Sequence, residues 1–251
     1  MTTAVTIKNI TFQEGTTLIC VPLIGQTLDE LKAHARTLAE AGADLIEWRV
    51  DHFTAVGDRD QVLLALTEIR RLLADIPLLF TFRSHKEGGE TEIGDDAYFA
   101  LNRLAVASGL VDIIDIELFN DEMPIRALID EAHAAGVKVI MSNHDFQTTP
   151  AQEEIIARLR RMQELGADLP KIAVIPQSPQ DVLTLLSATL VMKERYATRP
   201  LITMSMGKLG GVSRVTGRLF GSAMTFGSVG QASAPGQIAV RQLREMMNIL
   251  S

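Results

Sequence analysis

Residues 45–51 of this chain read Leu-Ile-Glu-Trp-Arg-Val-Asp, an apolar run in which every second residue is charged. In a β-strand, successive side chains point to opposite faces. The isoleucine, tryptophan and valine therefore share one face, and Glu47, Arg49 and Asp51 share the other. The apolar face suits packing under a helix, and charges on the opposite face need partners because unpaired buried charges are costly. This stretch predicts a barrel strand that faces a polar interior.

Apolar runs of this kind recur along the whole chain, and segments with helical periodicity lie between them. Parallel strands need such crossover helices. Eight strand–helix units in 251 residues predict a closed (β/α)₈ TIM barrel that forms a single catalytic domain over residues 1–251. A weakly alternating segment, residues 5–12, precedes the first unit and predicts a short N-terminal β-hairpin that covers the barrel floor. The eight runs begin near Leu18, Leu45, Leu78, Val111, Lys138, Lys171, Leu201 and Ala223.

Helix starts can be read from capping signals. Thr27 and Glu30 have the spacing of a capping box, and Ser178-Pro179 gives a cap followed by a proline. Thr149-Pro150, followed by Gln152, has the same order. These signals predict helices that begin directly after each pair.

Composition narrows the function classes. The net charge is −7 and no basic stripe is present, so a nucleic-acid partner is not expected. The single cysteine, Cys20, excludes an internal disulfide framework and fits a reducing compartment. The N-terminus lacks a secretory pattern and no apolar run approaches the roughly 18 residues that span a membrane. We expect a cytoplasmic protein without a membrane partner.

Lys171 lies inside an apolar run and shares a strand face with Ala173 and Ile175. One interpretation is a lysine at a strand edge that reaches solvent. The other is a buried amine nucleophile, because burial near other cations favours a neutral amine that can attack a carbonyl. Spacing alone leaves both open.

His144 ends a strand and follows Ile140 and Ser142 on the same face. The ordinary imidazole pKa of about 6.5 suits proton transfer near neutral pH. The alternative is a histidine held locally, for example by Asp145.

An anion site is predicted where the loops follow the last two strands. Arg214 lies in a glycine-containing loop after the seventh run, and residues 233–237, Ser-Ala-Pro-Gly-Gln, follow the eighth and precede the last helix. Loops at these positions commonly bind anions in barrels. An arginine there could bind a carboxylate or a phosphate, and the sequence alone does not distinguish these two anions.

Metal and nucleotide signals are weak. The chain has no His-Glu-x-x-His, no cysteine cluster and no G-x-G-x-x-G after the first strand. Asp115 and Glu117 share a strand face and could ligate Mg²⁺, but we do not expect a metal or an organic cofactor.

Taken together, six motifs resemble the type I 3-dehydroquinate dehydratase family, from about Leu18 to the C-terminus. Their order and spacing make the resemblance specific, although no single motif would. The motifs are Glu47-Trp48-Arg49, Phe80-Thr81-Phe82-Arg83 with Glu87, Ser142-Asn143-His144-Asp145-Phe146, Pro170-Lys171-Ile172-Ala173-Val174, Ser213-Arg214 and Ser233-Ala234-Pro235-Gly236-Gln237.

The resemblance implies a homodimeric barrel of the shikimate pathway that uses no cofactor and removes water, in the syn sense, from 3-dehydroquinate. It implies that Lys171 forms an imine (Schiff base) with the substrate ketone, that His144 moves the proton and that Glu87 orients His144. The remaining roles that it implies are carboxylate binding by Arg214, Ser233 and Gln237, contacts to ring hydroxyls by Glu47 and Arg83 with support from Arg49, and an apolar side formed by Phe146, Met204, Met206 and Phe226.

One loop departs from the family pattern. Leu209 stands where family members often carry an acidic residue, and Gly211 stands near a usual aliphatic position. Two adjacent glycines predict a more mobile loop. Two alternatives to the dehydratase are another imine-forming barrel of the class I aldolase type and a non-catalytic ligand-binding barrel, which would leave an imine-competent Lys171 unexplained.

Overall fold

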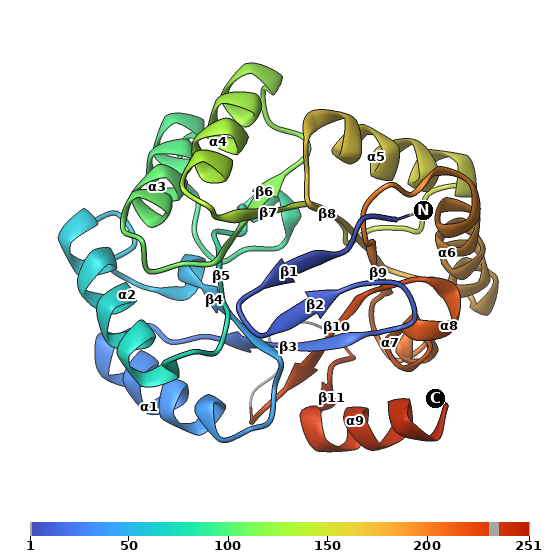
Figure 1. Ribbon diagram of the computed structural model, residues 1–251, viewed down its shortest axis with the longest axis horizontal. Coiled ribbons are helices and arrows are strands. Elements are labelled where there is room, and N and C mark those ends of the chain that lie inside the picture. Colours follow the sequence, from blue (N-terminus) through green and yellow to red (C-terminus); the bar gives the residue numbers. More distant parts are fainter. Residues whose placement is uncertain (1, 231–235, 251) are drawn as a thin grey trace.

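The structure is a computed structural model that describes residues 2–230 and 236–250, and it is a (β/α)₈ barrel (Figure 1). The strands run parallel in the order β3-β4-β5-β6-β7-β8-β9, with β10 beside β3. The barrel strands are β3 (Leu18–Leu23), β4 (Leu45–Arg49), β5 (Leu78–Thr81), β6 (Ile113–Glu117), β7 (Lys138–Asp145), β8 (Leu169–Val174), β9 (Ile202–Ser205) and β10 (Met224–Ser228).

The barrel closes between β9 and β10 at the ends where these strands begin. Leu201 and Ser222 form an isolated parallel bridge, and the Ala223 N–H donates to the Leu201 carbonyl at 2.7 Å. A short strand, β11 (Ile238–Ala239), extends the sheet beside β10.

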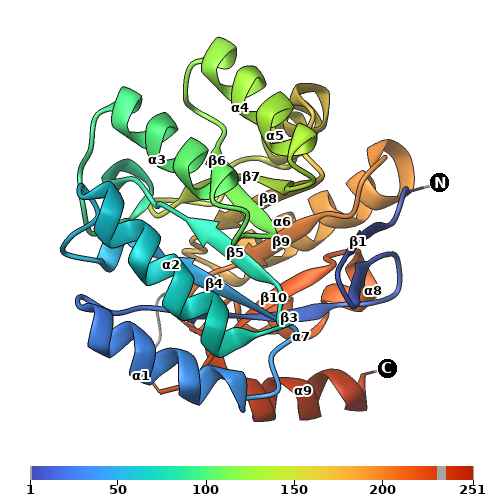
Figure 2. The same ribbon diagram turned by 60° about the vertical axis from the view of Figure 1, so that its left-hand side comes forward.

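Helices surround the sheet (Figure 2). The short elements η1 (Val50–His52) and η2 (His85–Glu87) follow β4 and β5, and the π-helical segment η3 (Met192–Tyr196) extends the sixth helix. The helices are α1 (Leu28–Ala39), α2 (Arg59–Leu73), α3 (Asp95–Ala107), α4 (Glu122–Ala134), α5 (Gln152–Leu165), α6 (Pro179–Val191), α7 (Gly211–Val215), α8 (Gly217–Phe220) and α9 (Val240–Ile249).

Two apolar clusters divide the core as the strand alternation predicts. The outer cluster lies between the sheet and the helices and includes Ile46, Trp48 and Phe80. The inner cluster fills the barrel interior near the ends where the strands begin, here called the lower part, and includes Leu79 and Ile140. The charged faces of β4 to β8 therefore point into the barrel above the inner cluster.

An N-terminal hairpin covers the barrel floor, as predicted. Strands β1 (Val5–Ile7) and β2 (Ile10–Phe12) pair in antiparallel fashion and lie in front of the barrel in Figure 1. Phe12 is fully buried, and the hairpin's apolar side chains belong to the inner cluster with residues at the strand starts, such as Leu45 and Leu169. The hairpin seals the end of the barrel opposite the strands' carboxyl ends.

Two helix starts match their capping signals and one does not. Thr27 Oγ1 accepts from the Glu30 N–H, and Ser178 forms a complete capping box with Asp181. The prediction for Thr149 was wrong: α5 begins at Gln152 after Ala151, without a side-chain cap. Thr149 Oγ1 instead donates to the Ile175 carbonyl, which ties this loop to the end of β8.

Lys171 also lies differently from the prediction, which placed it at a strand start. Strand β8 begins two residues earlier, at Leu169, and Lys171 pairs with Ser142 in the middle of the sheet. His144 pairs with Ala173 one inward-facing layer higher. The long lysine side chain thus begins in the layer below His144 and can extend towards it.

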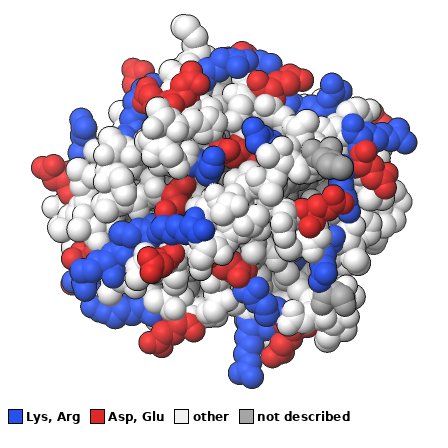
Figure 3. Space-filling model, viewed as in Figure 1, with Lys and Arg blue, Asp and Glu red and all other residues white. Residues whose placement is uncertain are grey.

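The molecular surface carries mixed charges. On the face drawn in Figure 3, lysine and arginine side chains are interspersed with aspartate and glutamate around the rim. Among the described residues, no helix is both long enough and apolar enough to cross a bilayer.

Candidate active site

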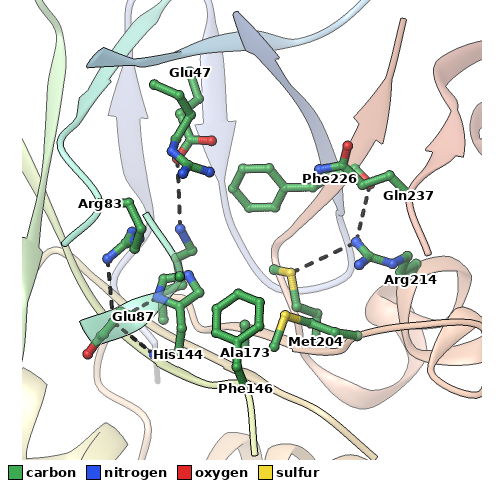
Figure 4. A pocket seen from close by; sticks show the side chains of 14 residues that line it. Glu47, Arg83, Glu87, His144, Phe146, Ala173, Met204, Arg214, Phe226 and Gln237 are labelled. Carbon is green, nitrogen blue, oxygen red and sulfur yellow. Dashed lines mark hydrogen bonds and ion pairs between the residues drawn. The ribbon is translucent and has the colours of Figure 1, made fainter. Parts of the chain in front are cut away.

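A cavity of about 200 Å³ opens at the carboxyl ends of the barrel strands. Typical pockets for drug-sized ligands measure about 300–1,000 Å³, so this volume suits one small ring. Acid–base side chains lie on one side of the cavity, and Arg214 and Gln237 lie on the other (Figure 4). All predicted site residues among the described residues line it: Glu47, Arg49, Arg83, Glu87, His144, Lys171, Arg214 and Gln237.

Lys171 is buried on the inner face of β8, with an exposed fraction of only 2%. This position excludes the interpretation of a lysine that reaches bulk solvent from a strand edge. Its Nζ donates to Asp115 Oδ2 at 3.2 Å and lies 3.9 Å from Glu47 Oε1. The face of the Phe226 ring lies 4.8 Å from Nζ, so a positive charge at this atom is stabilised from three sides.

Arg83 connects the acidic groups under the cavity. Its guanidinium donates to Glu117 Oε1 at 2.7 Å, to Asp115 Oδ1 at 2.9 Å and to Ser142 Oγ at 3.0 Å. Although burial acts to raise it, Arg83 and Lys171 hold the pKa of Asp115 below its ordinary value. Asp115 therefore pairs as an anion with Arg83 and Lys171. These contacts disfavour the Mg²⁺ site that the sequence suggested for Asp115 and Glu117.

Glu87 and His144 form a tightly bound pair. Glu87 Oε2 accepts from His144 Nδ1 and from the His144 backbone N–H, both at 2.9 Å. Because a carboxylate at this position accepts, a neutral imidazole carries its proton on Nδ1 and leaves Nε2 as a lone-pair acceptor. Burial, followed by the cations Arg83, Lys171 and Arg49, lowers the pKa of His144 well below its ordinary value, so the imidazole is neutral and able to accept a proton.

The turn that carries Glu87 depends on two glycines. Gly88 has φ of +84°, a backbone conformation that favours glycine, and a Cβ atom there would meet the Phe146 ring at 2.5 Å. A Cβ atom on Gly89 would lie 1.9 Å from the Arg83 carbonyl oxygen. This tight path after β5 brings Glu87 back over the barrel to His144 on β7.

Glu47 and Arg49 project from β4 into the same cavity. Glu47 Oε1 accepts from Thr81 Oγ1 at 2.9 Å. Arg49 forms two parallel bonds of 2.7 Å to the buried carboxylate of Asp51. A bidentate pair of this kind fixes the guanidinium plane, so Asp51 holds Arg49 in place.

Arg214 lies on α7, and the loop before it is anchored. Ser213 Oγ accepts from the Ser205 N–H at 2.9 Å and donates to the Gly210 carbonyl at 2.7 Å. Arg214 itself is 1% exposed and donates to the Phe226 carbonyl at 3.4 Å. Burial lowers the pKa of Arg214 to about 10, so the side chain is still a cation at neutral pH.

The expected apolar side chains also line the cavity. Phe146, Met204, Met206 and Phe226 line it, and Figure 4 shows Phe146, Met204 and Phe226 between the acid–base side chains and Arg214. Gln237 lies beside Arg214 just before β11, and the last helix begins three residues later, at Val240. Ser233 lies outside the described residues.

Sequence reasoning did not single out several residues that build the site. Asn143 donates from Nδ2 to Glu87 Oε1 at 3.1 Å, and Ser142 Oγ donates to Asp115 at 2.6 Å. Both lie in the motif 142–146, but alternation along the strand assigns only Ser142 to the inner face. A signal for Asn143 exists only in the folded chain, where η2 brings Glu87 across the strand end.

Known proteins of one family are similar to this chain along its whole length. A family model described as type I 3-dehydroquinase matches residues 19–251. A 3-dehydroquinate dehydratase of Klebsiella pneumoniae is 79% identical over 251 residues and both chains are covered in full; one of Bacillus licheniformis is 57% identical over 98% of this chain and 97% of its own.

A solved structure is similarly close. The type I 3-dehydroquinate dehydratase of Clostridium difficile, crystallised with covalently modified comenic acid, superposes with a TM-score of 0.96 at 52% identity. The match covers 99% of this chain and 98% of that chain.

Proposed function

Since this chain belongs to the type I 3-dehydroquinase family, we propose that it is a hydro-lyase that converts 3-dehydroquinate to 3-dehydroshikimate through an imine on Lys171. The observation that carries the proposal is the buried Lys171 Nζ in a cavity that also contains the His144–Glu87 pair and Arg214. The covalently modified ligand of the Clostridium difficile relative supports covalent chemistry in this family. The proposed reaction uses no metal or organic cofactor.

The first step forms the imine. The Lys171 ammonium group first gives one proton to solvent, and the resulting amine attacks the substrate ketone. The addition product takes a proton back as its hydroxyl leaves as water, which leaves a protonated imine at Nζ. That nitrogen stays cationic, so Asp115 and Glu47, at 3.2 Å and 3.9 Å, are placed to stabilise it as they stabilise the ammonium group. A fixed carboxylate in a cavity shielded from water is an effective stabiliser because it needs no reorganisation.

The second step moves one proton. Nε2 of His144 takes a proton from the carbon next to the imine, and the electron pair is stored as an enamine. The imidazolium then gives this proton to the leaving hydroxyl, so water departs and a conjugated imine remains. General acid–base help of this kind contributes roughly 10²–10⁴-fold. Hydrolysis of the imine returns the Lys171 amine and releases the product.

Residues on two sides of the cavity orient the substrate in this scheme. Arg214 binds the carboxylate with Ser233 and Gln237, and the acid–base side of the cavity takes the ring hydroxyls through Glu47 and Arg83, supported by Arg49. The distance between these two sides fixes the ring across the mouth of the barrel. Orientation at two ends is worth several kcal/mol, about 7–11 in favourable cases.

The biological context follows from the same membership. We propose a cytoplasmic homodimer in aromatic amino-acid biosynthesis, with 3-dehydroquinate as its small-molecule partner and no nucleic-acid or membrane partner. Light scattering coupled to size exclusion should give twice the mass of the chain. A mass equal to one chain would contradict the dimer and leave the chemistry unaffected.

Borohydride trapping tests the proposed function. The protein is incubated with 3-dehydroquinate and sodium borohydride, and the digest is analysed by mass spectrometry. A reduced adduct on the peptide that contains Lys171 is expected, together with dehydration in untreated samples. Lys171→Ala should remove both, with the fold retained. Adducts from aldehyde or phosphorylated sugar substrates, but not from 3-dehydroquinate, would favour the aldolase-type alternative.

A further inference from the structure

Asn143 connects an arginine on the outer helix layer to the His144–Glu87 pair. Its Nδ2 donates to Glu87 Oε1 at 3.1 Å, and its Oδ1 accepts from Arg158 NH1 at 2.9 Å. Arg158 belongs to α5 and Asn143 to β7, so the contact joins a helix to the strand that carries His144. Asn143 is buried, with an exposed fraction of 3%.

Arg158 decides which way the Asn143 amide faces. A guanidinium has only N–H donors, so the atom opposite it must be the amide oxygen. The NH₂ group of Asn143 then faces Glu87 as a donor. Without the arginine, both amide orientations become available, and one of them would place a carbonyl oxygen against the carboxylate.

The arginine is itself fixed from several sides. Its Nε donates to Glu154 Oε1 at 2.7 Å, one helical turn earlier on α5. The guanidinium carbon lies 5.3 Å from the centre of the Phe119 ring, and NH1 lies 4.0 Å from Asp145 Oδ2. A side chain with this many contacts loses little further freedom when it bonds Asn143.

Glu87 depends on donors because it is buried among other carboxylates. Its two oxygens accept from Asn143, from the His144 backbone and from the His144 ring. Burial raises the pKa of Glu87 to about 7, and the Asn143 bond acts in the opposite direction. The ionised form of Glu87 therefore relies on a donor whose orientation Arg158 sets.

We propose that Arg158 is a positioning residue: it holds the Asn143 amide with its NH₂ group towards Glu87, and thereby keeps Glu87 ionised and aligned to bind the Nδ1–H of His144. The inference rests on the proposed function, because it assigns Arg158 a role in the proton transfer by His144. Arg158 contacts neither Lys171 nor the substrate cavity.

Other charged groups also face Glu87 and contribute to its pKa. Arg83 lies 3.5 Å away, and Glu117 and Asp115 act on Glu87 from β6. A second cavity on the outer side of Glu87 is lined by further titratable groups: His85, Lys86, Glu92, Asp95, Asp145 and Arg158. Arg158 and Asn143 line this outer cavity and not the substrate cavity, so their substitution leaves the substrate contacts in place.

The experiment compares Arg158→Leu, Arg158→Lys and Arg161→Leu. Arg161 is the matched control, since it lies on the same helix and pairs with Glu122 and Glu164 on the surface. Dehydration of 3-dehydroquinate is measured from pH 5 to pH 10, and the Glu87 carboxyl is titrated by ¹³C NMR without substrate. Circular dichroism checks the fold.

In Arg158→Leu, the acid limb of the pH profile of kcat and the NMR titration midpoint of Glu87 should both move upward by about one pH unit. KM should change less than about twofold. At pH values below this limb, kcat should fall about tenfold relative to the parent, and it should recover at alkaline pH. Arg158→Lys should lie closer to the parent protein, because it keeps a donor, and Arg161→Leu should match the parent.

Asn143→Ala provides a second route that leaves α5 intact. It should shift the midpoint in the same direction, and the double variant with Arg158→Leu should add nothing, because Arg158 acts through Asn143. An unchanged Glu87 midpoint in Arg158→Leu, or an equal loss of activity at every pH, would overturn the inference.

The test separates the inference from the proposed function. If the parent protein neither dehydrates 3-dehydroquinate nor forms the Lys171 adduct, the proposed function fails. The NMR titration still decides whether Arg158 controls the ionisation of Glu87.

Discussion

Glu87 holds His144 at two atoms with one oxygen: Oε2 accepts from both the backbone N–H and ring Nδ1, each at 2.9 Å. The backbone contact fixes the carboxylate relative to β7, and the ring contact then fixes the imidazole relative to the carboxylate. The orientation of the ring is thus set by the strand and not by a flexible side chain. Its second nitrogen, Nε2, is left for the substrate.

Replacing Glu87 by glutamine should uncouple these contacts. Glutamine has one acceptor oxygen and one NH₂ group, whereas the site presents donors on both sides, from His144 and from Asn143. One buried donor must lose its partner, which costs about 1–3 kcal/mol, and the imidazolium loses its counter-ion. We expect kcat to fall about 10- to 100-fold in Glu87→Gln, measured by steady-state dehydration.

Borohydride trapping is the control for this variant, because among the described residues no hydrogen bond or ion pair joins Lys171 to Glu87. The adduct should form at the parental level. A Glu87→Gln enzyme with full kcat would show that His144 needs no anionic partner.

The pH dependence of stability should also report on Glu87. Its pKa in the folded protein is raised to about 7 from an ordinary value of 4.5, so between these values the folded state binds more protons than the unfolded chain. Glu87 therefore lowers the free energy of unfolding as pH rises from about 4.5 to about 7, by at most about 3 kcal/mol. His144 acts oppositely, because its pKa is lowered and the unfolded chain binds more protons up to pH 6.5.

Thermal melts of the parent and Glu87→Gln between pH 5 and pH 8 isolate the Glu87 contribution. The Tm difference, parent minus variant, should decrease as pH rises through this range. A difference that stays constant would place the pKa of Glu87 near its ordinary value.

The barrel was predictable because its strands carry a period-2 pattern with unusual charges. In residues 45–51 the alternation alone assigned Trp48 to the helix side and Glu47 to the interior, and both assignments hold. Strand starts were predicted to within two residues. At β8 the predicted start was too late, because a proline such as Pro170 usually lies at the boundary of a strand. Pro170 is instead the second residue of the strand.

Contacts between distant loops were beyond single-sequence reasoning. The Asn143 side chain meets Glu87, 56 residues away along the chain, only because the turn at Gly88 and Gly89 folds back over β7. The Thr149 cap failed for a similar reason: the Ile175 carbonyl offers its hydroxyl a tertiary acceptor that no local pattern encodes. Local signals predict elements, whereas these partners depend on the closed barrel.

The two adjacent glycines before Arg214 should respond differently to alanine. A Cβ atom on Gly210 would lie 2.1 Å from the Ser205 carbonyl oxygen, whereas one on Gly211 has no atom within 4 Å. Gly210→Ala should displace the segment that Ser213 anchors, raise KM about tenfold or more and destabilise the fold by about 1–3 kcal/mol. Gly211→Ala should leave KM unchanged and stabilise the fold by about 0.4–1 kcal/mol.

Steady-state kinetics and denaturant unfolding of the two variants provide the comparison. Equal effects would mean that loop mobility, and not the close approach of Gly210 to Ser205, governs this segment. Such a result would support the prediction of a more mobile loop, drawn from the glycine pair.

Arg214 should act through the substrate carboxylate and not through the imine. The side chain is a cation at neutral pH even though burial lowers its pKa to about 10, and it lies across the cavity from the His144–Glu87 pair. Arg214→Met should raise KM for 3-dehydroquinate about 10- to 100-fold, the value of a hydrogen bond to a charged group. An analogue in which a carboxamide replaces the carboxylate provides the control: the parent should discriminate strongly against it, and Arg214→Met should treat the two substrates nearly alike. If the variant kept the parental preference for the carboxylate, the anion would have to bind elsewhere in the cavity, and Arg83 or Arg49 on the opposite side would be the cations to substitute next.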